Sequence, residues 1–542
     1  MATLSSSPPA SPSVAERRAL LTRFAGDFLG LDCVDSVLSA APEPCTARRV
    51  YLDTTATALM ARNVWDGLQA YFVAASANSH TEAHRGGRDT TAAIEDSRHS
   101  IGRLVGYDPK SDVVLFTSNG ATGAINFLAR ALFPPELRPL VKRFPGGAPS
   151  SFVDALRDVL GVDGREAIDE MLARPLVVTS TMEHHSNLLP WMEAVGHENV
   201  RAVRVRPDGA LDLAHLAEIL AACGDRVRLV AITGVSNVTG IVNPVHQIAR
   251  MAHAVGAQIL VDGAQWVPHA AVEMHPRGEV DRAGDLDYLV LSGHKLYAPG
   301  SRGALIGTLA TLSGRRCVTD VGGGMVEYVT IDDFAIKDKV TAREEAGTPN
   351  IPGTIAMGLV AETLLTIGMD VIADAEHAMT SALIERLSAI DGVVLYGSTD
   401  LAKVPRAGVV AFNVDGVEHG LVASYLDDAH NIAVRNGCFC AQPYVKDLLS
   451  LHSDTAERFR HAIATGDRRN LPGMVRASLG VYSRLEDIDA LGTALEVLIR
   501  AQRALVAAYE SDREGTCRRR DGVDSPRTFA IGDVVRAWAE RG

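Results

Sequence analysis

The chain has 542 residues, of which 47% are apolar and 22% charged, and its formal net charge is −13. This composition is typical of a globular protein with a large buried core, and it excludes a wholly disordered chain. No basic block or stripe of lysines and arginines occurs in it, so we expect no nucleic-acid partner.

Membrane spans and a secretion signal are not expected either. The most apolar stretch, residues 353–369, contains Glu362 and is shorter than the roughly 20 residues that cross a bilayer. Residues 1–14 are rich in Ser, Pro and Ala and lack the charged and apolar regions of a secretory signal. The seven cysteines are few and odd in number, which argues against a disulfide scaffold. We therefore expect a soluble, cytoplasmic enzyme.

The first part of the chain predicts an extension followed by a large domain. Residues 1–47 are expected to form the extension, disordered at its Ser/Pro-rich start and amphipathic over 14–38. From Tyr51 onward, short β-rich apolar runs alternate with helical segments, which is the pattern of a parallel α/β sheet. This large domain is expected over residues 48–340, with an insertion at about 134–174.

An anion site is predicted after the first buried strand, residues 113–117. The strand runs into Ser-Asn-Gly-Ala-Thr-Gly at 118–123, and a helix is expected over 124–132. Glycines before a helix N-terminus leave free N–H donors and a favourable dipole for an anion. An ordinary Gly-rich turn has the same pattern, and both interpretations stay open for this segment taken alone. The Thr122 hydroxyl, with Ser292 and His294, could complete a phosphate site.

Three further runs between residues 228 and 295 share one design. Short, β-branched-rich strands are expected at 228–235, 258–261 and 288–291, each followed by polar residues. The carboxyl ends of parallel strands are where open α/β sheets bind ligands. Between the first two strands, a helix is expected to begin with Asn243 as its N-cap and Pro244 at its first position.

Lys295 follows the last of these strands, in Ser-Gly-His-Lys at 292–295. A lysine there can simply extend to solvent, but a partly desolvated amine also suits a Schiff base with an aldehyde cofactor. Asp262 ends the neighbouring strand, where it can cap a helix or pair with a protonated pyridine nitrogen. Asn237 and Gln265 stand at similar strand ends and can bond a phenolic oxygen of that ring. With the phosphate site, these residues predict pyridoxal 5′-phosphate as the cofactor.

After about residue 405 the pattern changes to mixed α and β. Strands are expected at 408–414, 430–434 and 474–481, and helices at 419–428 and 485–509. A smaller α+β domain is therefore expected over residues 341–510, with an insertion rich in charge at about 443–470 and a tail at 511–542.

In its motifs the chain resembles the class V aminotransferase family of pyridoxal-phosphate enzymes, and within it the cysteine desulfurases and selenocysteine lyases. The motifs that carry the resemblance follow the family's order at residues 51–53, 116–126, 182–187, 235–238, 261–265, 292–297, 345–350, 435–440 and 475–479. The resemblance implies the α/β architecture of fold type I. In that fold, a large domain has a mostly parallel, seven-stranded-type sheet, and a smaller α+β domain follows it.

The resemblance also implies a role for each site residue. Cofactor binding falls to Ala121, Thr122, His184, Asn237, Asp262, Gln265, Ser292, His294 and Lys295, and to Thr348 acting on the neighbouring subunit. His184 is expected to stack on the ring, and Thr348 implies a homodimer. Arg435 and Arg476 are expected to clamp the carboxylate of a small amino-acid substrate. No metal is expected.

Cys440 decides the expected reaction. It stands five positions after Arg435, as the nucleophilic cysteine does in cysteine desulfurases. A free thiol is mostly protonated at pH 7 and needs an activating neighbour, and free cysteine is also a common buried hydrophobe. The resemblance implies that L-cysteine is converted to L-alanine, with a persulfide on Cys440, Lys295 and His184 as the other catalytic residues, and a sulfur-acceptor protein as partner.

Some features depart from the family pattern. Residues 438–440 form a Cys-x-Cys, as in molybdenum-cofactor sulfurases. In an extended segment side chains two positions apart point the same way, so Cys438 can relay sulfur from Cys440. Thr55 stands where the family usually has alanine, and Trp266 is expected to reshape the substrate pocket.

Two alternatives stay open. The first is a class V aminotransferase, epimerase or lyase acting on a specialised amino acid, with Cys440 as a bystander. The second is a non-catalytic sulfur-carrier scaffold. Turnover that does not depend on Cys440 would indicate the first, and a chain without cofactor absorbance the second.

Overall fold

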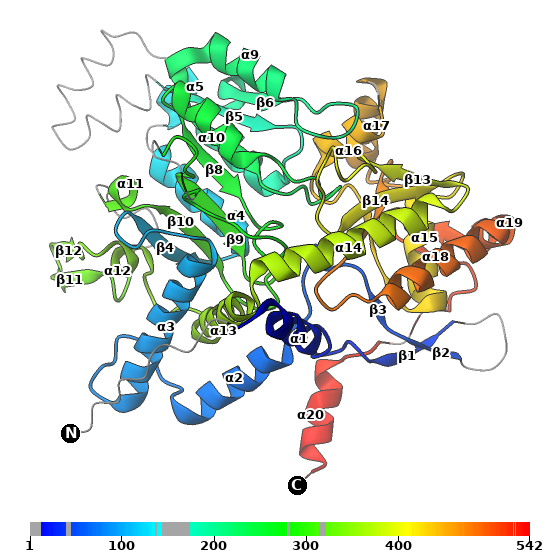
Figure 1. The fold of residues 1–542 in the computed structure, drawn as a ribbon, viewed down its shortest axis with the longest axis horizontal. Helices are drawn as coiled ribbons and strands as arrows, with labels where there is room; N and C mark the ends of the chain where they lie inside the picture. The colour runs from blue at the N-terminus through cyan, green and yellow to red at the C-terminus, as the bar shows by residue number, and fades with distance from the viewer. Residues whose placement is uncertain are drawn as a thin grey trace.

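The computed structural model describes residues 12–38, 45–135, 138–143, 174–276, 278, 282–313, 321–451, 453–469, 471–523, 525 and 527–541. Two α/β bodies lie side by side, and the long helix α14 (Met369–Ser388) runs from one to the other (Figure 1). The larger body contains a seven-stranded sheet and the smaller one a four-stranded sheet.

The large sheet is mostly parallel. Its strand order is β4 (Asp112–Thr117), β10 (Gly303–Thr308), β9 (Tyr288–Ser292), β8 (Gln258–Asp262), β7 (Val227–Thr233), β5 (Leu176–Ser180) and β6 (Val200–Val203). Only β10 is antiparallel to its neighbours, with Gly303 opposite both Thr117 and Ser292. This arrangement confirms the predicted mostly parallel sheet.

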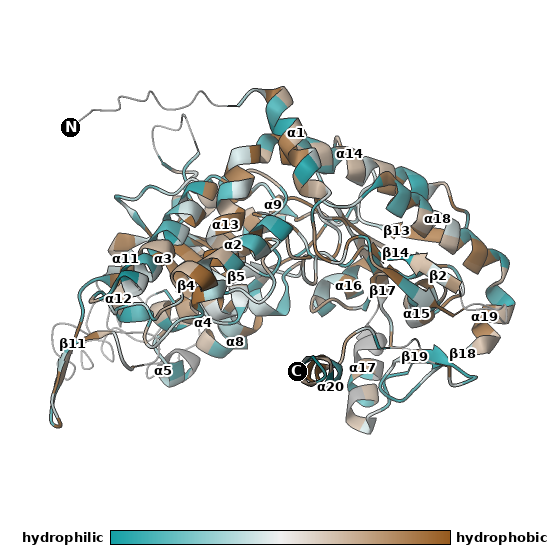
Figure 2. Cartoon of the chain, turned by 90° about the horizontal axis from the view of Figure 1, so that it is seen from below, coloured by the Kyte–Doolittle hydropathy of each residue, from teal (hydrophilic) through white to brown (hydrophobic). Residues whose placement is uncertain are grey.

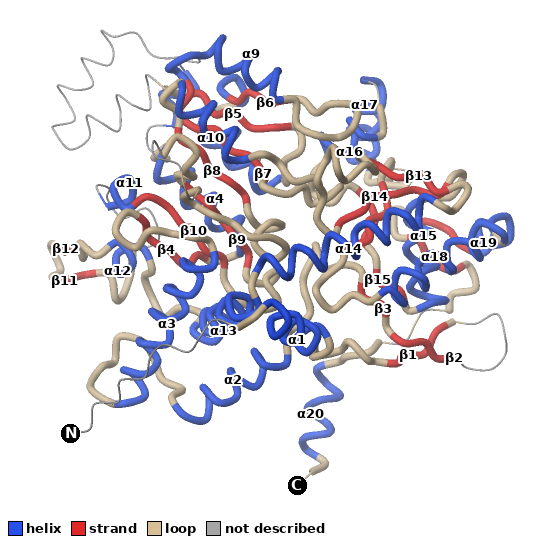
Figure 3. Tube along the Cα trace, in the orientation of Figure 1, coloured by secondary structure: helices blue, strands red, loops and turns tan. Residues whose placement is uncertain are grey.

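Helices cover both faces of this sheet, as its wholly buried strands require (Figure 3). The helices of this body are α1 (Val14–Ala25), α2 (Arg62–Ala74), α3 (Arg85–Leu104), α4 (Gly120–Leu132), α5 (Arg138–Arg143), α8 (Leu189–Val195), α9 (Leu213–Cys223), α10 (Val245–Ala254), α11 (Leu309–Ser313), α12 (Val340–Glu344) and α13 (Ile351–Ile367). In Figure 2 the helices of this body carry both hydrophilic and hydrophobic residues, while the strands β4 and β5 are wholly buried.

Helix α13 is apolar on nearly every side because it is a core helix of the large body. The Asn350 side chain accepts a hydrogen bond from Gly353 N and so caps its start. Helix α13 packs against α3. At this contact Gly358 lies so close to Ser97 that a Cβ on residue 358 would come within 2.3 Å of the serine hydroxyl. Glycine at 358 therefore permits this helix contact.

The small body is an antiparallel sheet with helices on it. Its strand order is β13 (Val393–Tyr396), β14 (Val409–Val414), β17 (Met474–Ser478) and β16 (Arg435–Gly437). Its helices, after α14, are α15 (His419–His430), α16 (Gln442–Leu448), α17 (Ser453–Thr465), α18 (Leu485–Arg500) and α19 (Gln502–Ala508). A separate apolar core forms between this sheet and the helices α14, α15 and α18.

Small two-stranded sheets and one terminal helix complete the chain. The pairs are β1 (Val34–Val37) with β2 (Cys45–Arg48), β3 (Val50–Tyr51) with β15 (Ile432–Ala433), β11 (Val326–Val329) with β12 (Phe334–Ile336), and β18 (Tyr509–Ser511) with β19 (Cys517–Arg519). The parallel β3–β15 pair joins the start of the large body to the small one. Helix α20 (Ile531–Ala539) projects from the rest (Figure 1).

Several predicted elements are corrected. Helix α4 begins at Gly120, four residues earlier than predicted, because Asn119 turns the chain with φ +57°. Pro244, and not Asn243, occupies the N-cap of α10, since the Asn243 amide donates to Thr233 O at 2.9 Å.

In the small body, the strand predicted at 430–434 contributes β15, which pairs with β3 outside the small sheet. The single helix predicted at 485–509 is broken at Ala501 into α18 and α19.

The predicted domain boundaries stay predictions. Helix α13 follows the boundary predicted at residue 340, yet its side chains share one apolar cluster with α2, α3 and the large sheet. Most of the predicted 134–174 insertion lies outside the described residues, as do residues 1–11. The described part of 443–470 is helical.

Among the described residues, no single helix is long and apolar enough to cross a bilayer. Only α13 and α14 taken together pass that test, and their axes meet at 84°.

Candidate active site

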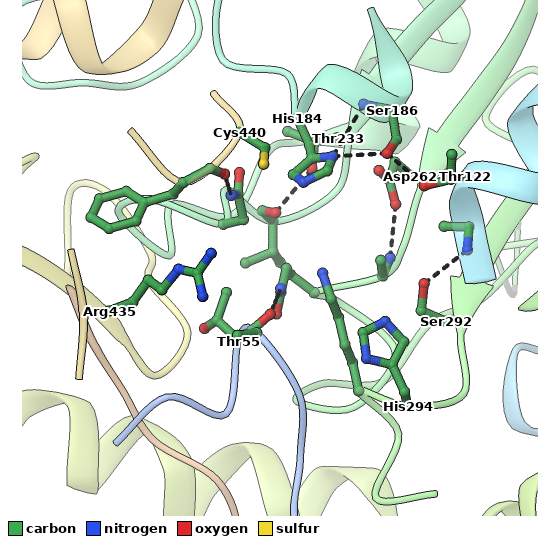
Figure 4. Close-up of a pocket in the computed structure, with 18 of the residues that line it drawn as sticks. Thr55, Thr122, His184, Ser186, Thr233, Asp262, Ser292, His294, Arg435 and Cys440 are labelled. Carbon is green, nitrogen blue, oxygen red and sulfur yellow. Dashed lines mark hydrogen bonds between the residues drawn. The ribbon is translucent and has the colours of Figure 1, made fainter. Parts of the chain in front are cut away.

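A cavity of about 330 Å³ lies at the carboxyl ends of the large-sheet strands, where residues of the small body close one side (Figure 4). Its lining is mostly polar or charged. The residues that line it are Thr55, Ala56, Asn119, Ala121, Thr122, His184, Ser186, Thr233, Val235, Asn237, Asp262, Ala264, Gln265, Ser292, His294, Lys295, Arg435, Phe439, Cys440 and Arg476. All the predicted site residues except Thr348 therefore meet in one place.

Lys295 lines the cavity from the turn after β9. Burial lowers the pKa of its amine to about 8, against the opposing attraction of Asp262. Its Nζ makes no hydrogen bond with another described residue. A lysine with a lowered pKa and a free amine at neutral pH is suited to nucleophilic attack on a carbonyl.

Asp262 and Gln265 form the floor beside the lysine. Asp262 ends β8, its Oδ1 accepts from Ala264 N at 3.0 Å, and burial raises its pKa while Lys295 lowers it. The Gln265 Nε2 donates to Thr55 O at 2.8 Å, while its Oε1 is buried with no hydrogen-bond partner among the described residues. A buried acceptor without a partner is costly, which indicates that a bound molecule supplies a donor there.

The start of α4 forms the anion end of the cavity. Asn119 and Gly120 have positive φ, and a Cβ on Gly120 would lie 2.8 Å from the Ser292 Oγ. Ala121 N donates to that Oγ at 2.8 Å. Thr122 Oγ1 lies 2.7 Å from Ser186 Oγ. Hydroxyls thus gather at the N-terminus of a helix, as the prediction required.

The two histidines of the cavity are neutral at physiological pH. Burial, assisted by the charge of Lys295, lowers the pKa of His184 to about 3. The same two causes lower the pKa of His294 to about 4. His184 Nδ1 accepts from Ser186 N at 3.1 Å, which fixes the ring's orientation. A neutral, fixed imidazole is suited to stacking against a flat ring.

Two arginines face each other across adjacent strands. Arg435 of β16 is paired with Arg476 of β17 in the sheet register, so their positive charges repel. Arg476 is 3% exposed, and burial lowers its pKa to about 10. Asp53 accepts from its Nη2 at 3.0 Å, but one carboxylate does not balance two guanidinium groups. An anion bound in the cavity would neutralise the remaining positive charge of the two arginines.

Cys440 lies in a turn that we call the Cys440 turn, residues 438–440. Phe439 and Cys440 both have left-handed backbones, with φ of +52° and +55°. Each such residue costs roughly 1–2 kcal/mol. The Cys440 sulfur lies next to the His184 ring (Figure 4), and the Phe439 ring lies under the guanidinium of Arg476, 4.9 Å from its Cζ. The turn therefore presents the thiol to the cavity in a strained conformation.

The expected side-by-side placement of Cys438 and Cys440 is wrong. Because the turn is left-handed and not extended, the two side chains diverge: Cys440 lines the cavity, while Cys438 packs against a separate apolar cluster. The Cys438 thiol approaches Pro472 O at 3.4 Å, and burial raises its pKa. A direct relay between the thiols is thus not preformed.

The expected effect of Trp266 on the pocket is also wrong. Its ring is buried behind the cavity, where it packs over Gly234 and meets His246 edge-on at 6.3 Å between centroids. A side chain at 234 would collide with the indole ring at 2.8 Å. The bulk of Trp266 is therefore accommodated in the core by glycine.

Thr348 lies away from the cavity, exposed in the loop between α12 and α13. The loop is anchored next to it: Glu345 accepts from Arg98 at 2.7 Å and from Phe116 N at 2.9 Å. Thr348 therefore cannot serve this cavity from its present position, and its predicted role toward a neighbouring subunit stays a prediction.

Sequence reasoning missed several residues of the site. Asp53 supports Arg476, Ser186 holds both His184 and Thr122, and the buried ring of Phe439 supports Arg476 from the other side. Asp53 and Ser186 stand inside motifs that the sequence displays, at 51–53 and 182–187. Their roles depend on contacts between distant segments, for which the sequence carries no local signal.

The fold is that of fold type I pyridoxal-phosphate enzymes, and the cavity lies at the carboxyl ends of its mostly parallel sheet. The family model "Aminotransferase class-V" matches residues 50–140 and 166–491. The chain belongs to the class V aminotransferase family. This confirms the predicted family and fold.

Curated relatives carry the name of one activity. A "Probable cysteine desulfurase" of Halalkalibacterium halodurans is 32% identical over 450 residues, which cover 82% of this chain and 92% of that protein. A "Cysteine desulfurase" of Salmonella typhimurium is 32% identical over 449 residues, with the same two coverages.

Solved structures agree with this. The apo structure of a cysteine desulfurase from Thermococcus onnurineus NA1 matches with a TM-score of 0.65 and 28% identity, over 84% of this chain and 95% of that one. The cysteine desulfurase CsdA from Escherichia coli, titled as an S-sulfonic acid form, matches with a TM-score of 0.62 and 25% identity, over 83% and 95%.

Proposed function

We propose that the protein is a pyridoxal-phosphate-dependent cysteine desulfurase that converts L-cysteine to L-alanine and takes the sulfur onto Cys440. One observation carries the proposal: the Cys440 thiol and the Lys295 amine line the same cavity. The names of the relatives support this choice of substrate.

The donor set of the cavity fits pyridoxal 5′-phosphate. The α4 N-terminus with Ala121, Thr122, Ser292 and His294 would hold the phosphate, and the neutral ring of His184 would stack on the cofactor. Asp262 would pair with the ring nitrogen, since burial and a positive partner suit a shared proton. The buried, unpartnered Gln265 Oε1 and the amide of Asn237 are within the same lining, near where a phenolic oxygen would lie.

When bound, this cofactor supplies an electron sink that makes the Cα proton of an amino acid acidic. Lys295 would move that proton, because the lowered pKa of its amine leaves a useful fraction neutral near pH 7–8. Arg435 and Arg476 would hold the substrate carboxylate, and Asp53 keeps Arg476 oriented. This fixes the substrate sulfur on the side where Cys440 lies.

Cys440 would then attack the substrate sulfur as a thiolate. A sulfur–sulfur bond forms on Cys440 Sγ while the Cβ–S bond of the substrate breaks, and the carbon is reprotonated to give alanine. The Cys440 thiol lines the same cavity as the Lys295 amine and the Arg476 guanidinium. The cysteine is exposed, which supports onward transfer to a sulfur-acceptor protein.

A homodimer is part of the proposal. Thr348 is exposed on a loop that is tied to the large body by Glu345, so it is available to the cofactor phosphate of a second copy. The other residues that we propose for cofactor binding line one cavity of a single chain, which supports a role for Thr348 toward a second copy.

The test is product analysis of the purified holoenzyme with L-cysteine as the only substrate. We expect alanine and reducible sulfur in equal amounts, with both lost in Cys440→Ser. Turnover of other amino acids that is unaffected by Cys440→Ser would instead indicate the aminotransferase, epimerase or lyase alternative. A chain that shows no cofactor absorbance would indicate the scaffold.

A further inference from the structure

The Cys440 turn is shaped largely by the large body and not by its own strand. Asn237 Nδ2 donates to Phe439 O at 2.8 Å, and His185 N donates to Cys440 O at 2.6 Å. Both donors belong to segments that follow strands of the large sheet. Consecutive carbonyls of a left-handed turn are thus fixed from across the cavity.

Of these two donors, only the Asn237 amide belongs to a side chain; the His185 donor is a backbone N–H. Asn237 is 7% exposed and follows β7. Its own carbonyl accepts from Arg476 Nη1 at 2.9 Å, and that guanidinium covers the Phe439 ring. One residue therefore connects the Cys440 turn to the arginine that faces the substrate carboxylate.

We infer that Asn237 is a positioning residue for Cys440. Its amide compensates the strain of the two left-handed residues, and without that donor the turn can relax to ordinary backbone angles and carry the thiol away from the substrate sulfur. The inference rests on the proposed function, because it takes Cys440 as the group that attacks the substrate.

The first experiment measures the turn itself. Hydrogen exchange of the backbone amides is followed in a peptide spanning residues 438–448 of the holoenzyme. Asn237→Ala should speed this exchange about tenfold, because opening of the turn becomes easier. The matched control is Asn199→Ala: Asn199 is also buried and donates Nδ2 to a backbone carbonyl, that of Val195 at 3.0 Å, but it does not line the cavity.

The second experiment measures the chemistry. In a single turnover with L-cysteine, Asn237→Ala should slow persulfide formation on Cys440 by about two- to tenfold, the range for one net hydrogen bond. Since Asn237 also lines the cavity where the phenolic oxygen of the cofactor is expected, the variant and the wild type are compared at equal cofactor occupancy, which absorbance measures. Asn237→Asp should be slower still, because a carboxylate at this position cannot donate to the Phe439 carbonyl.

The outcomes separate this inference from the proposed function. Unchanged exchange and unchanged persulfide formation in Asn237→Ala overturn the inference. A rate loss that disappears at equal cofactor occupancy also overturns it, because Asn237 then acts on the rate through the cofactor alone. If the wild type makes no persulfide while Asn237→Ala still speeds hydrogen exchange in residues 438–448, the proposed function fails and the role of Asn237 in positioning the turn stands.

Discussion

At the scale of residues, burial has the largest effect on the pKa values of the charged groups in the cavity. Lys295 and Asp262 are opposite charges in one buried site, yet burial is the larger influence on each, lowering the pKa of the lysine and raising that of the aspartate. The two groups therefore do not neutralise each other as a fixed ion pair. An amine with a pKa of about 8 is partly neutral at physiological pH, which an exposed lysine is not.

This lowered pKa gives a prediction for cofactor capture. The neutral amine is the reactive form, so the rate at which apoprotein takes up pyridoxal 5′-phosphate on Lys295 should rise as pH increases through about 8. Borohydride reduction followed by peptide mapping measures the rate at each pH. Labelling of Lys403, an exposed lysine, is the control for non-specific reaction. A rise centred above pH 10, or a label on a different lysine, would contradict the account.

Much of the site can be predicted at this scale because its residues stand at strand ends. Lys295, Asp262 and Gln265 follow strands that adjoin in the sheet, so proximity follows from topology. The relation of Cys438 to Cys440 cannot be predicted this way. It depends on two left-handed residues, Phe439 and Cys440, whose conformation is held by donors more than 200 positions away in the chain.

At the scale of elements, charged side chains form hydrogen bonds with the outer backbone groups of the edge strand β4, where a further strand would otherwise pair. Arg98 donates to Val114 O at 2.6 Å, Glu345 accepts from Phe116 N at 2.9 Å, and Arg302 donates to Phe116 O at 2.8 Å. Since β4 leads into the phosphate end of the cavity, this network supports the site as well as the sheet edge.

Glu345 should therefore matter more for stability than its neighbour Glu95. Both carboxylates pair with Arg98, but the Glu345 side chain is 9% exposed and that of Glu95 is 46% exposed. Glu345→Ala should lower the free energy of unfolding by about 3 kcal/mol, because it removes the buried carboxylate that balances the charge of Arg98. Glu95→Ala should cost less than about 1 kcal/mol. Urea unfolding measures both, and equal losses would contradict this view of the network.

At the scale of the whole molecule, the alternation of strands and helices predicts the class of fold and the order of its two bodies. It does not predict the association of α13. That helix is apolar on nearly every side, so its pattern does not indicate which elements it packs against. Its apolar cluster with α2, α3 and the large sheet, and the close fit of Gly358 on Ser97, assign it to the large body. The β3–β15 pair cannot be predicted from the sequence either, because each strand has only two residues and the two lie far apart in the chain.

The proposed homodimer is tested by Thr348. Thr348→Ala should weaken retention of the cofactor by about tenfold or more, the value of a hydrogen bond to a charged phosphate, while the dimer persists. Dialysis against buffer without cofactor and analytical ultracentrifugation measure the two effects. The matched control is Thr366→Ala, because Thr366 is also an exposed threonine but lies on α13 and not in the loop before it. A monomer that keeps its cofactor and its activity would contradict the shared site.

The central claim is that sulfur passes from L-cysteine to Cys440, and mass analysis of the protein after a single turnover tests it most directly. We predict one added sulfur atom on the peptide that carries Cys440, in the wild type and in Cys438→Ser. Cys440→Ser should bind L-cysteine with the same change in cofactor absorbance and gain no sulfur. Sulfur found on Cys438, or sulfide released undiminished by Cys440→Ser, would contradict the account.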